Sequence, residues 1–178
     1  MTRRNFYILT GGPGGGKTSL LNYLLTKGYP YIPETAREII RHRLTNGLPP
    51  RPNPAEFARQ MFSIDFDNYL SKAHLESLLF FDRSFLDSAY LLHDADLNAY
   101  KEIENTLVTN RYNQRVFVTP PWEEIYQTDS ERDQTFAEAI EVYNKICSWY
   151  SKHNYEIIMI PNETIEIRSK FILEQVYH

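Results

Sequence analysis

Residues 10–21 of the chain, TGGPGGGKTSLL, place five glycines and a proline immediately before a single lysine. The spacing Gly11-x-x-x-x-Gly16-Lys17-Thr18 is the P-loop pattern. Glycine lets the backbone reach positive φ, and it lets backbone N–H groups approach phosphate oxygens without a Cβ in the way. A helix that begins at this point presents further free N–H groups and the positive end of its dipole to an anion. The pattern therefore predicts a nucleotide-phosphate site.

Two side chains of this loop have specific roles in the prediction. Lys17 is expected to reach the β- and γ-phosphates, and the Thr18 hydroxyl is expected to ligate Mg²⁺. The alternative is a glycine-rich structural turn with an idle lysine. The predicted nucleotide-binding residues are Gly12, Pro13, Gly14, Gly15, Gly16, Lys17, Thr18 and Ser19.

A second group of interest ends the most apolar run of the chain, SLLFFDRS at 77–84. In an α/β sheet, ligands bind beyond the carboxyl ends of the strands, so an acid at this position is suited to hold Mg²⁺ directly or through water. Asp82 is therefore the predicted second metal ligand beside Thr18. Its alternative role is the N-cap of a helix over 84–92.

Glu34 occupies the matching place after another strand, in YIPETARE. We expect it to orient or deprotonate an acceptor hydroxyl, with Asp82 as the other candidate for the base. The alternative is a first-turn glutamate favoured by the helix dipole. Arg37, one turn later, and Arg83, next to Asp82, complete the predicted substrate-binding residues, although an arginine on a helix face is often only solvated or paired.

The polar segment over 120–134, PPWEEIYQTDSERDQ, lies between a strand and a helix, where kinases of this fold carry a lid. A closing lid excludes water and brings a cation onto the transferring phosphoryl group. Arg132 is the one cation of the segment and is the predicted fourth catalytic residue, with Lys17, Glu34 and Asp82. The alternative is an exposed turn in which Asp129 or Ser130 caps the next helix.

Strands and helices must alternate to position these residues, which indicates an α/β fold with a mainly parallel five-stranded sheet between two layers of helices. The central run, 77–81, reads as a buried strand. In the helix that starts at Thr35, the positions Ala36, Ile39, Ile40 and Leu44 are expected to face inward. Strands are predicted at 5–10, 29–33, 77–81, 115–119 and 156–160, and helices at 19–26, from 35, and at 55–74, 87–93, 97–109, 136–151 and 163–176.

Composition narrows the class of protein. A length of 178 residues fits a single domain over 1–178. The formal net charge of -4 gives no electrostatic footprint for nucleic acid. A single cysteine, Cys147, cannot form an internal disulfide, and no apolar run is long enough for a signal peptide or a membrane span. We therefore expect a cytoplasmic protein, with no indication of its oligomeric state.

Four stretches together resemble a known family: GGPGGGKTSLL, PETAREII, FFDRSFLDS and IYQTDSERDQTFAEAIEVY. They are similar to the small P-loop proteins labelled AAA-like predicted ATPases, which include the ribosylnicotinamide kinase domain of the NAD regulator. The resemblance covers nearly the whole chain. It implies a P-loop NTPase fold with a nucleoside- or nucleotide-kinase-like core, Mg-ATP on the P-loop, Asp82 near the metal, and Glu34 with Arg37 toward the acceptor.

The expected function is transfer of the γ-phosphoryl group of Mg-ATP to a small nucleoside- or nucleotide-like acceptor. A regulatory GTPase is disfavoured because Asn144-Lys145-Ile146-Cys147 lacks the aspartate of a base-reading N-K-x-D motif. A nucleotide-dependent sensor or NTPase that binds a protein or phosphoinositide partner stays open, because it needs the same phosphate cradle. The acceptor and the preference for ATP over GTP are not specified by these patterns.

Overall fold

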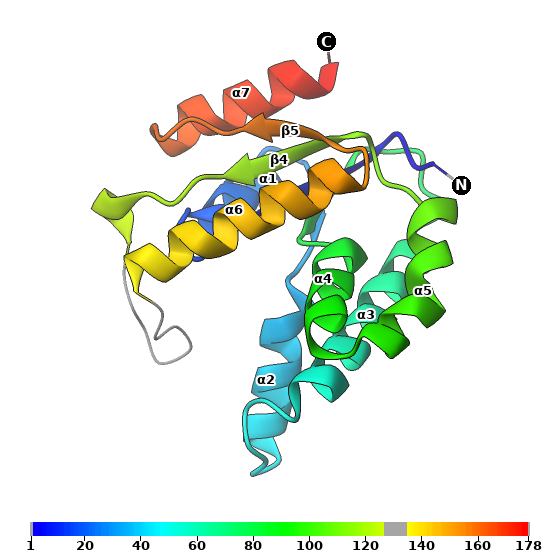
Figure 1. Ribbon diagram of the computed structural model, residues 1–178. Coiled ribbons are helices and arrows are strands. Elements are labelled where there is room, and N and C mark those ends of the chain that lie inside the picture. Colours follow the sequence, from blue (N-terminus) through cyan, green and yellow to red (C-terminus); the bar gives the residue numbers. More distant parts are fainter. Residues whose placement is uncertain (1, 127–134, 178) are drawn as a thin grey trace.

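A computed structural model describes residues 2–126 and 135–177 of the chain. Its centre is a parallel sheet of five strands in the order β2-β3-β1-β4-β5, with helices on both faces (Figure 1). Ile8 of the central strand lies opposite Phe81 on one side and Val116 on the other. The predicted α/β fold is thereby confirmed. The strands are β1 (Phe6–Gly11), β2 (Tyr31–Ile32), β3 (Leu79–Asp82), β4 (Arg115–Thr119) and β5 (Glu156–Met159).

The helices follow the predicted order, with most ends within about two residues of expectation. The third helix ends at Ser71 rather than at 74, and the predicted strand at 29–33 shrinks to two paired residues. The helices are α1 (Lys17–Thr26), α2 (Thr35–Thr45), α3 (Pro54–Ser71), α4 (Phe85–Ala95), α5 (Leu97–Thr109), α6 (Phe136–Lys152) and α7 (Ile165–Tyr177), with a short 3-10 turn, η1 (Glu123–Ile125).

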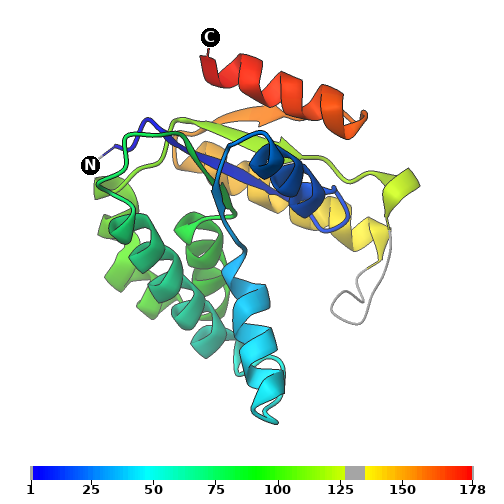
Figure 2. The same ribbon diagram turned by 180° about the vertical axis from the view of Figure 1, so that it is seen from behind.

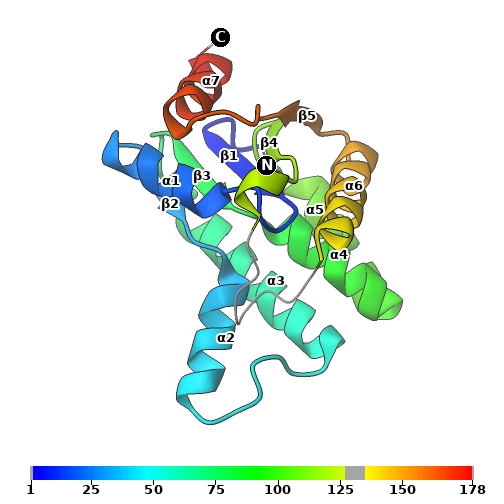
Figure 3. The same ribbon diagram turned by 90° about the vertical axis from the view of Figure 1, so that its left-hand side faces the viewer.

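The central strand β1 is buried on both faces, so its side chains pack alternately into two separate hydrophobic cores. Phe6 and Ile8 pack into the larger core beneath α3, α4, α5 and α6. Tyr7 and Leu9 point to the opposite face and pack against α1 and α7. Figure 3, which looks along the sheet, shows α1 and α7 on one side and α4, α5 and α6 on the other. Because all the paired strands are parallel, their carboxyl ends lie at a single edge of the sheet.

Two of the helices that begin near this edge, α4 and α6, start with a capping box. Ser84 caps α4 in a capping box in which its side chain and that of Asp87 satisfy each other's backbone N–H groups. Thr135 and Glu138 form the corresponding box at α6. The alternative N-cap role of Asp82 is therefore wrong, because Ser84 performs it. Thr135 also holds the capping position for which Asp129 or Ser130 was the alternative.

Helix α2 leaves the sheet and projects downward in Figures 1 and 2. It packs on α3 mainly through its first turns, where Ile39 and Ile40 are buried. Leu44, predicted to face inward, is 54% exposed because the neighbouring helix no longer covers this end of α2. The inward prediction for Leu44 is wrong, and α2 is attached to the core through one end.

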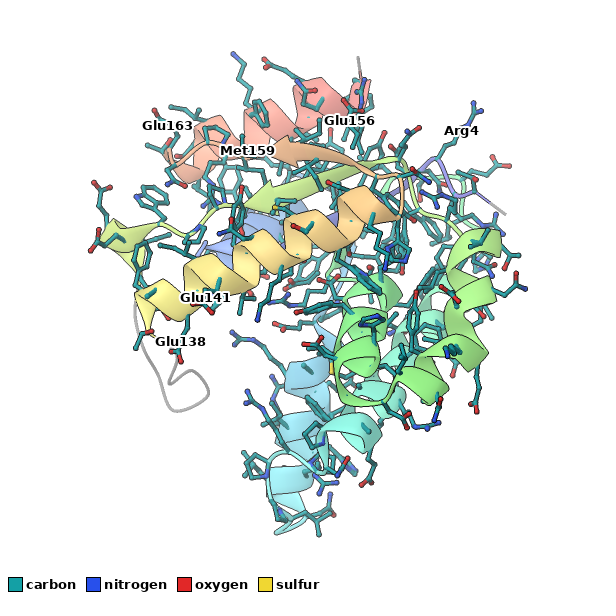
Figure 4. All side chains as sticks on the ribbon, viewed as in Figure 1. Arg4, Glu138, Glu141, Glu156, Met159 and Glu163 are labelled. Carbon is teal, nitrogen blue, oxygen red and sulfur yellow. The ribbon has the colours of Figure 1, made fainter. Side chains whose placement is uncertain are left out.

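The outer surface carries charged side chains. Figure 4 shows Glu138 and Glu141 on the outer face of α6, and Glu156 and Met159 on the edge strand β5, all of them exposed. Within residues 2–126 and 135–177, no helix combines the length and the apolar character needed to span a bilayer.

Candidate functional site

The loop between β1 and α1 forms a tight cradle at the carboxyl edge of the sheet. Gly16, at the N-cap of α1, has φ 70° and ψ 23°, a left-handed conformation that favours glycine. Gly14 has φ +79°, and a Cβ there would lie 2.2 Å from the Tyr126 ring. The loop therefore needs glycine at both positions for its conformation, and at Gly14 also because Tyr126 covers it. Four of its predicted residues, Gly12 to Gly15, are buried, whereas Thr18 and Ser19 are exposed.

Lys17 lies folded over its own loop. Its side chain is buried, and Nζ donates hydrogen bonds to the carbonyl oxygens of Gly12 at 2.8 Å and Gly11 at 3.2 Å. A buried ammonium beside the N-terminus of a helix makes this edge strongly attractive to anions. The positive charge also acts on both nearby acids, because it lowers the pKa of Glu34 and opposes the rise in the pKa of Asp82.

Thr18 and Asp82 lie together, as predicted for a metal site. The Thr18 hydroxyl donates to Asp82 Oδ2 at 3.5 Å, and Asp82 Oδ1 is buried with no hydrogen-bond partner among the described residues. Burial raises the pKa of Asp82 to about 6, against the opposing effect of Lys17. An orphaned buried carboxylate oxygen beside a threonine hydroxyl fits a hard cation such as Mg²⁺, which takes oxygen ligands and keeps several waters or phosphate oxygens. The described residues hold no cluster of three or more His, Cys, Asp or Glu side chains suited to a metal.

Glu34 is the centre of an ion-pair network at the start of α2. Its carboxylate accepts from Arg83 Nε at 3.0 Å and from Arg37 Nε at 3.2 Å. Burial alone would raise the pKa of Glu34, but Arg83, Lys17 and Arg37 together hold it below its ordinary value. Glu34 is therefore ionised at neutral pH. It sits at the N-cap position of α2 but makes no capping hydrogen bond, so its side chain is turned toward the arginines instead.

Arg83 connects the acids of neighbouring elements. Its backbone has φ 69°, a left-handed conformation that costs about 1–2 kcal/mol in a non-glycine residue. Such strain gathers at functional sites, where the surroundings enforce it. Besides Glu34, its guanidinium contacts Asp87 Oδ1 at 3.5 Å. Burial would lower the pKa of Arg83, but Glu34, Asp87 and Asp82 outweigh it and raise that pKa.

Two further acids, Asp87 and Asp65, form hydrogen bonds next to this network, and neither was predicted from the sequence. Asp87 accepts from Thr10 Oγ1 at 2.6 Å and from the Tyr150 hydroxyl at 2.5 Å, in addition to its capping contacts. Asp65 of α3 accepts from Thr35 Oγ1 at 2.5 Å and from the Ser88 hydroxyl. Burial raises the pKa of Asp65 to about 7, with Asp87 and Glu34 adding to the effect of burial. The capping-box spacing could have identified Asp87, but no local pattern indicates Asp65.

A cavity of about 670 Å³ opens beside the phosphate loop and joins these groups. Its mouth is lined by loop residues, including Lys17 and Thr18, and one wall carries Glu34, Arg37 and Arg83. The remaining walls come from α2, α3, α4, α6 and the segment between α2 and α3. These wall residues include Ile40, Phe57, Met61, Tyr90, Leu91, Val142 and Ile146, with Arg51, Asp94 and Lys145 among the charged ones.

The predicted site residues thus come together, with a few exceptions. Glu34, Arg37, Arg83, Lys17, Thr18 and Ser19 line one cavity, and Asp82 reaches it through Thr18. Gly12 and Gly15 do not line it, because they pack against Ala139 and Thr119. Arg132 and the stretch 127–134 of the predicted lid lie outside the described residues.

Arg168 of α7 is a further residue at the phosphate loop that no sequence pattern predicted. Its side chain is buried and donates to the carbonyl oxygen of Gly15 at 2.7 Å. The two residues are 153 positions apart in the chain, so no local spacing could have linked them.

Comparison with known proteins gives a family and a fold for the chain. A family model described as an AAA domain matches residues 6–168. No curated protein matches the sequence. Among solved structures, the chain is similar to deoxyadenosine kinase from M. mycoides with the products dCMP and dCDP bound. That match has a TM-score of 0.70 and 14% identity, and it covers 97% of this chain and 98% of the other.

The NadR protein in complex with NR is also similar, with a TM-score of 0.68, 14% identity and 97% of this chain covered. This chain spans 50% of that protein. A second NadR structure, in complex with NAD and AMP-PNP, has a TM-score of 0.64 at 14% identity, with 97% of this chain and 48% of that one covered. At this level of identity the likeness establishes a shared fold.

Proposed function

The chain belongs to the AAA domain family, and from this premise we propose that it transfers the γ-phosphoryl group of ATP to a small acceptor. The observation that carries the proposal is a single cavity lined both by the phosphate loop and by the Glu34–Arg83 pair. A protein that only binds nucleotide needs the phosphate loop but not the Glu34–Arg83 pair. An ionised carboxylate held next to that cradle, with space beyond it, suits an acceptor hydroxyl.

The donor binds at the loop. Backbone N–H groups and the N-terminus of α1 surround the phosphates, and Lys17 moves from the carbonyl oxygens of Gly11 and Gly12 to phosphate oxygens. Thr18 and Asp82 would hold Mg²⁺. When bound, this ion would neutralise part of the negative charge on the β- and γ-phosphates. The AMP-PNP in the NadR structure supports an ATP-type donor on this fold.

Transfer is an in-line displacement. The acceptor oxygen forms a bond to the γ-phosphorus while the bond from that phosphorus to the β–γ bridging oxygen breaks, and ADP leaves with the electron pair. Glu34, ionised at neutral pH, takes the proton of the acceptor hydroxyl. Arg83 and Arg37 hold the Glu34 carboxylate and add positive charge next to the transferring group.

The acceptor is a nucleoside- or nucleotide-like molecule. A cavity of about 670 Å³ falls within the range of small-molecule sites, and its apolar walls with the aromatic rings of Phe57 and Tyr90 suit a planar base. The deoxyadenosine kinase match, with dCMP and dCDP bound, and the NadR match, with NR bound, support this class.

A binding and turnover screen tests the proposal. Purified protein with Mg-ATP or Mg-GTP is assayed for ADP or GDP release against a panel of nucleosides, nucleoside monophosphates and other small hydroxyl compounds. We expect at least one acceptor to raise product release well above background hydrolysis and to yield a phosphorylated product. Nucleotide-dependent stabilisation without any accelerating acceptor would instead favour a nucleotide sensor.

A further inference from the structure

The last helix places a buried arginine against the phosphate loop. Arg168 of α7 is 4% exposed, and its Nη2 donates to the carbonyl oxygen of Gly15 at 2.7 Å. Burial lowers the pKa of the guanidinium. Among the described residues, no carboxylate forms a salt bridge with it. A buried cation without an opposite charge is unfavourable and normally acquires a partner.

The surroundings of this guanidinium compensate its charge only in part. Its Nε is buried and has no hydrogen-bond partner within residues 2–126 and 135–177, and the centroid of the Trp122 ring lies 5.7 Å from the guanidinium carbon. Nη1 approaches the loop so closely that a Cβ at Gly16 would lie 2.9 Å from it. An anion that compensates the charge of Arg168 would therefore bind beside Gly15 and Gly16, where the loop forms its phosphate cradle.

The bond from Arg168 also orients one peptide group of that cradle. A trans peptide is planar, and its C=O and N–H point in opposite directions. Because Arg168 holds the Gly15 carbonyl oxygen toward α7, the N–H of Gly16 points away from α7. A charge-assisted bond to the carbonyl further polarises this N–H as a donor.

We propose that Arg168 is a positioning residue of the donor site, which aims the Gly16 N–H at a bound phosphate and supplies a buried positive charge that the phosphates compensate. The inference rests on the proposed donor site at the loop, but not on the identity of the acceptor. It assigns to α7 a part in phosphate binding as well as its packing against α1.

The experiment compares binding of Mg-ATP and of Mg-tripolyphosphate, measured by calorimetry, in matched variants. Arg168→Met removes the charge and the bond, whereas Arg168→Lys keeps a cation. Arg115→Met is the control, because Arg115 Nη1 also ties α7 to the sheet, through the Gln175 carbonyl oxygen at 2.5 Å, away from the loop.

We expect Arg168→Met to weaken both ligands by about tenfold or more, the loss typical of a charge-assisted hydrogen bond. The factor should be similar for ATP and tripolyphosphate, because the base is not involved. Arg168→Lys should recover part of the loss, and Arg115→Met should bind within about twofold of wild type.

Wild-type affinity in Arg168→Met would overturn the inference. Equal losses in Arg168→Met and Arg115→Met would also overturn it, because they would reduce the role to docking of α7. Should Arg168→Met fail to fold, Arg168→Lys carries the test, and affinity no weaker than that of Arg115→Met would contradict the proposal. A wild-type protein that binds tripolyphosphate but phosphorylates no acceptor would refute the proposed function and leave this inference standing.

Discussion

The two sides of the cavity are built in different ways. The donor side consists of one continuous loop between β1 and α1, buried by Tyr126 and supported by α7. The acceptor side is assembled from α2, α3, α4 and α6, and within the described part of the chain α2 packs on the core at the end that carries Glu34. The structure of the donor side is therefore set largely by one segment of the chain, whereas the structure of the acceptor side depends on how separate helices pack together.

Removal of Lys17 should give the largest effect on nucleotide binding, because its ammonium is the side-chain charge that contacts the phosphates in the proposed donor site. Lys17→Met is expected to lower affinity for Mg-ATP by about 10²-fold or more and to abolish nucleotide-dependent thermal stabilisation. Thermal shift and calorimetry measure both quantities. Lys27→Met, at an exposed lysine just after α1, is the matched control. Unchanged stabilisation of Lys17→Met by ATP would show that the loop is not the nucleotide site.

The second prediction separates the two sides. Glu34→Gln removes the proposed base, so turnover with an acceptor identified in the screen should fall by about 10²–10⁴-fold. The affinity for ATP should stay within a few-fold of wild type. Glu38→Gln, at an exposed position of the same helix, should have little effect. Steady-state kinetics measures the turnover of both variants, and ATP titration measures their affinity for ATP. Parallel loss of binding and turnover would place Glu34 on the donor side instead.

The third prediction concerns the support of α2 and is smaller. Because the pKa of Asp65 is raised from 3.8 to about 7, its neutral form is favoured in the fold, and the ionised form reduces stability as pH rises between about 4 and 7. Asp65→Asn should therefore raise the melting temperature at pH 8 more than at pH 5. The exposed Asp67→Asn is the control. An equal destabilisation by Asp65→Asn at both pH values would indicate that hydrogen-bond geometry, not charge, is decisive.

The same contrast explains what could be predicted from sequence. The P-loop, Asp82 and Glu34 follow from local spacing and from the rule that parallel strands end at one edge, and the structure brings them together. Asp65 and Arg168 act across large separations, through Thr35 and Gly15, so no local pattern indicates them. Leu44 was assigned inward from helical spacing, but whether a periodic position is covered depends on where the neighbouring helix ends.

The measurement that tests the central claim most directly is to fill the acceptor side while leaving the donor side intact. Met61 of α3 is buried and lines the cavity, so Met61→Trp should place a larger side chain in the acceptor side of the cavity. Leu70→Trp, exposed on the same helix, is the control. We predict that Met61→Trp binds Mg-ATP as tightly as wild type but loses acceptor-dependent ADP release. Acceptor-dependent release at the wild-type rate in Met61→Trp would contradict the account.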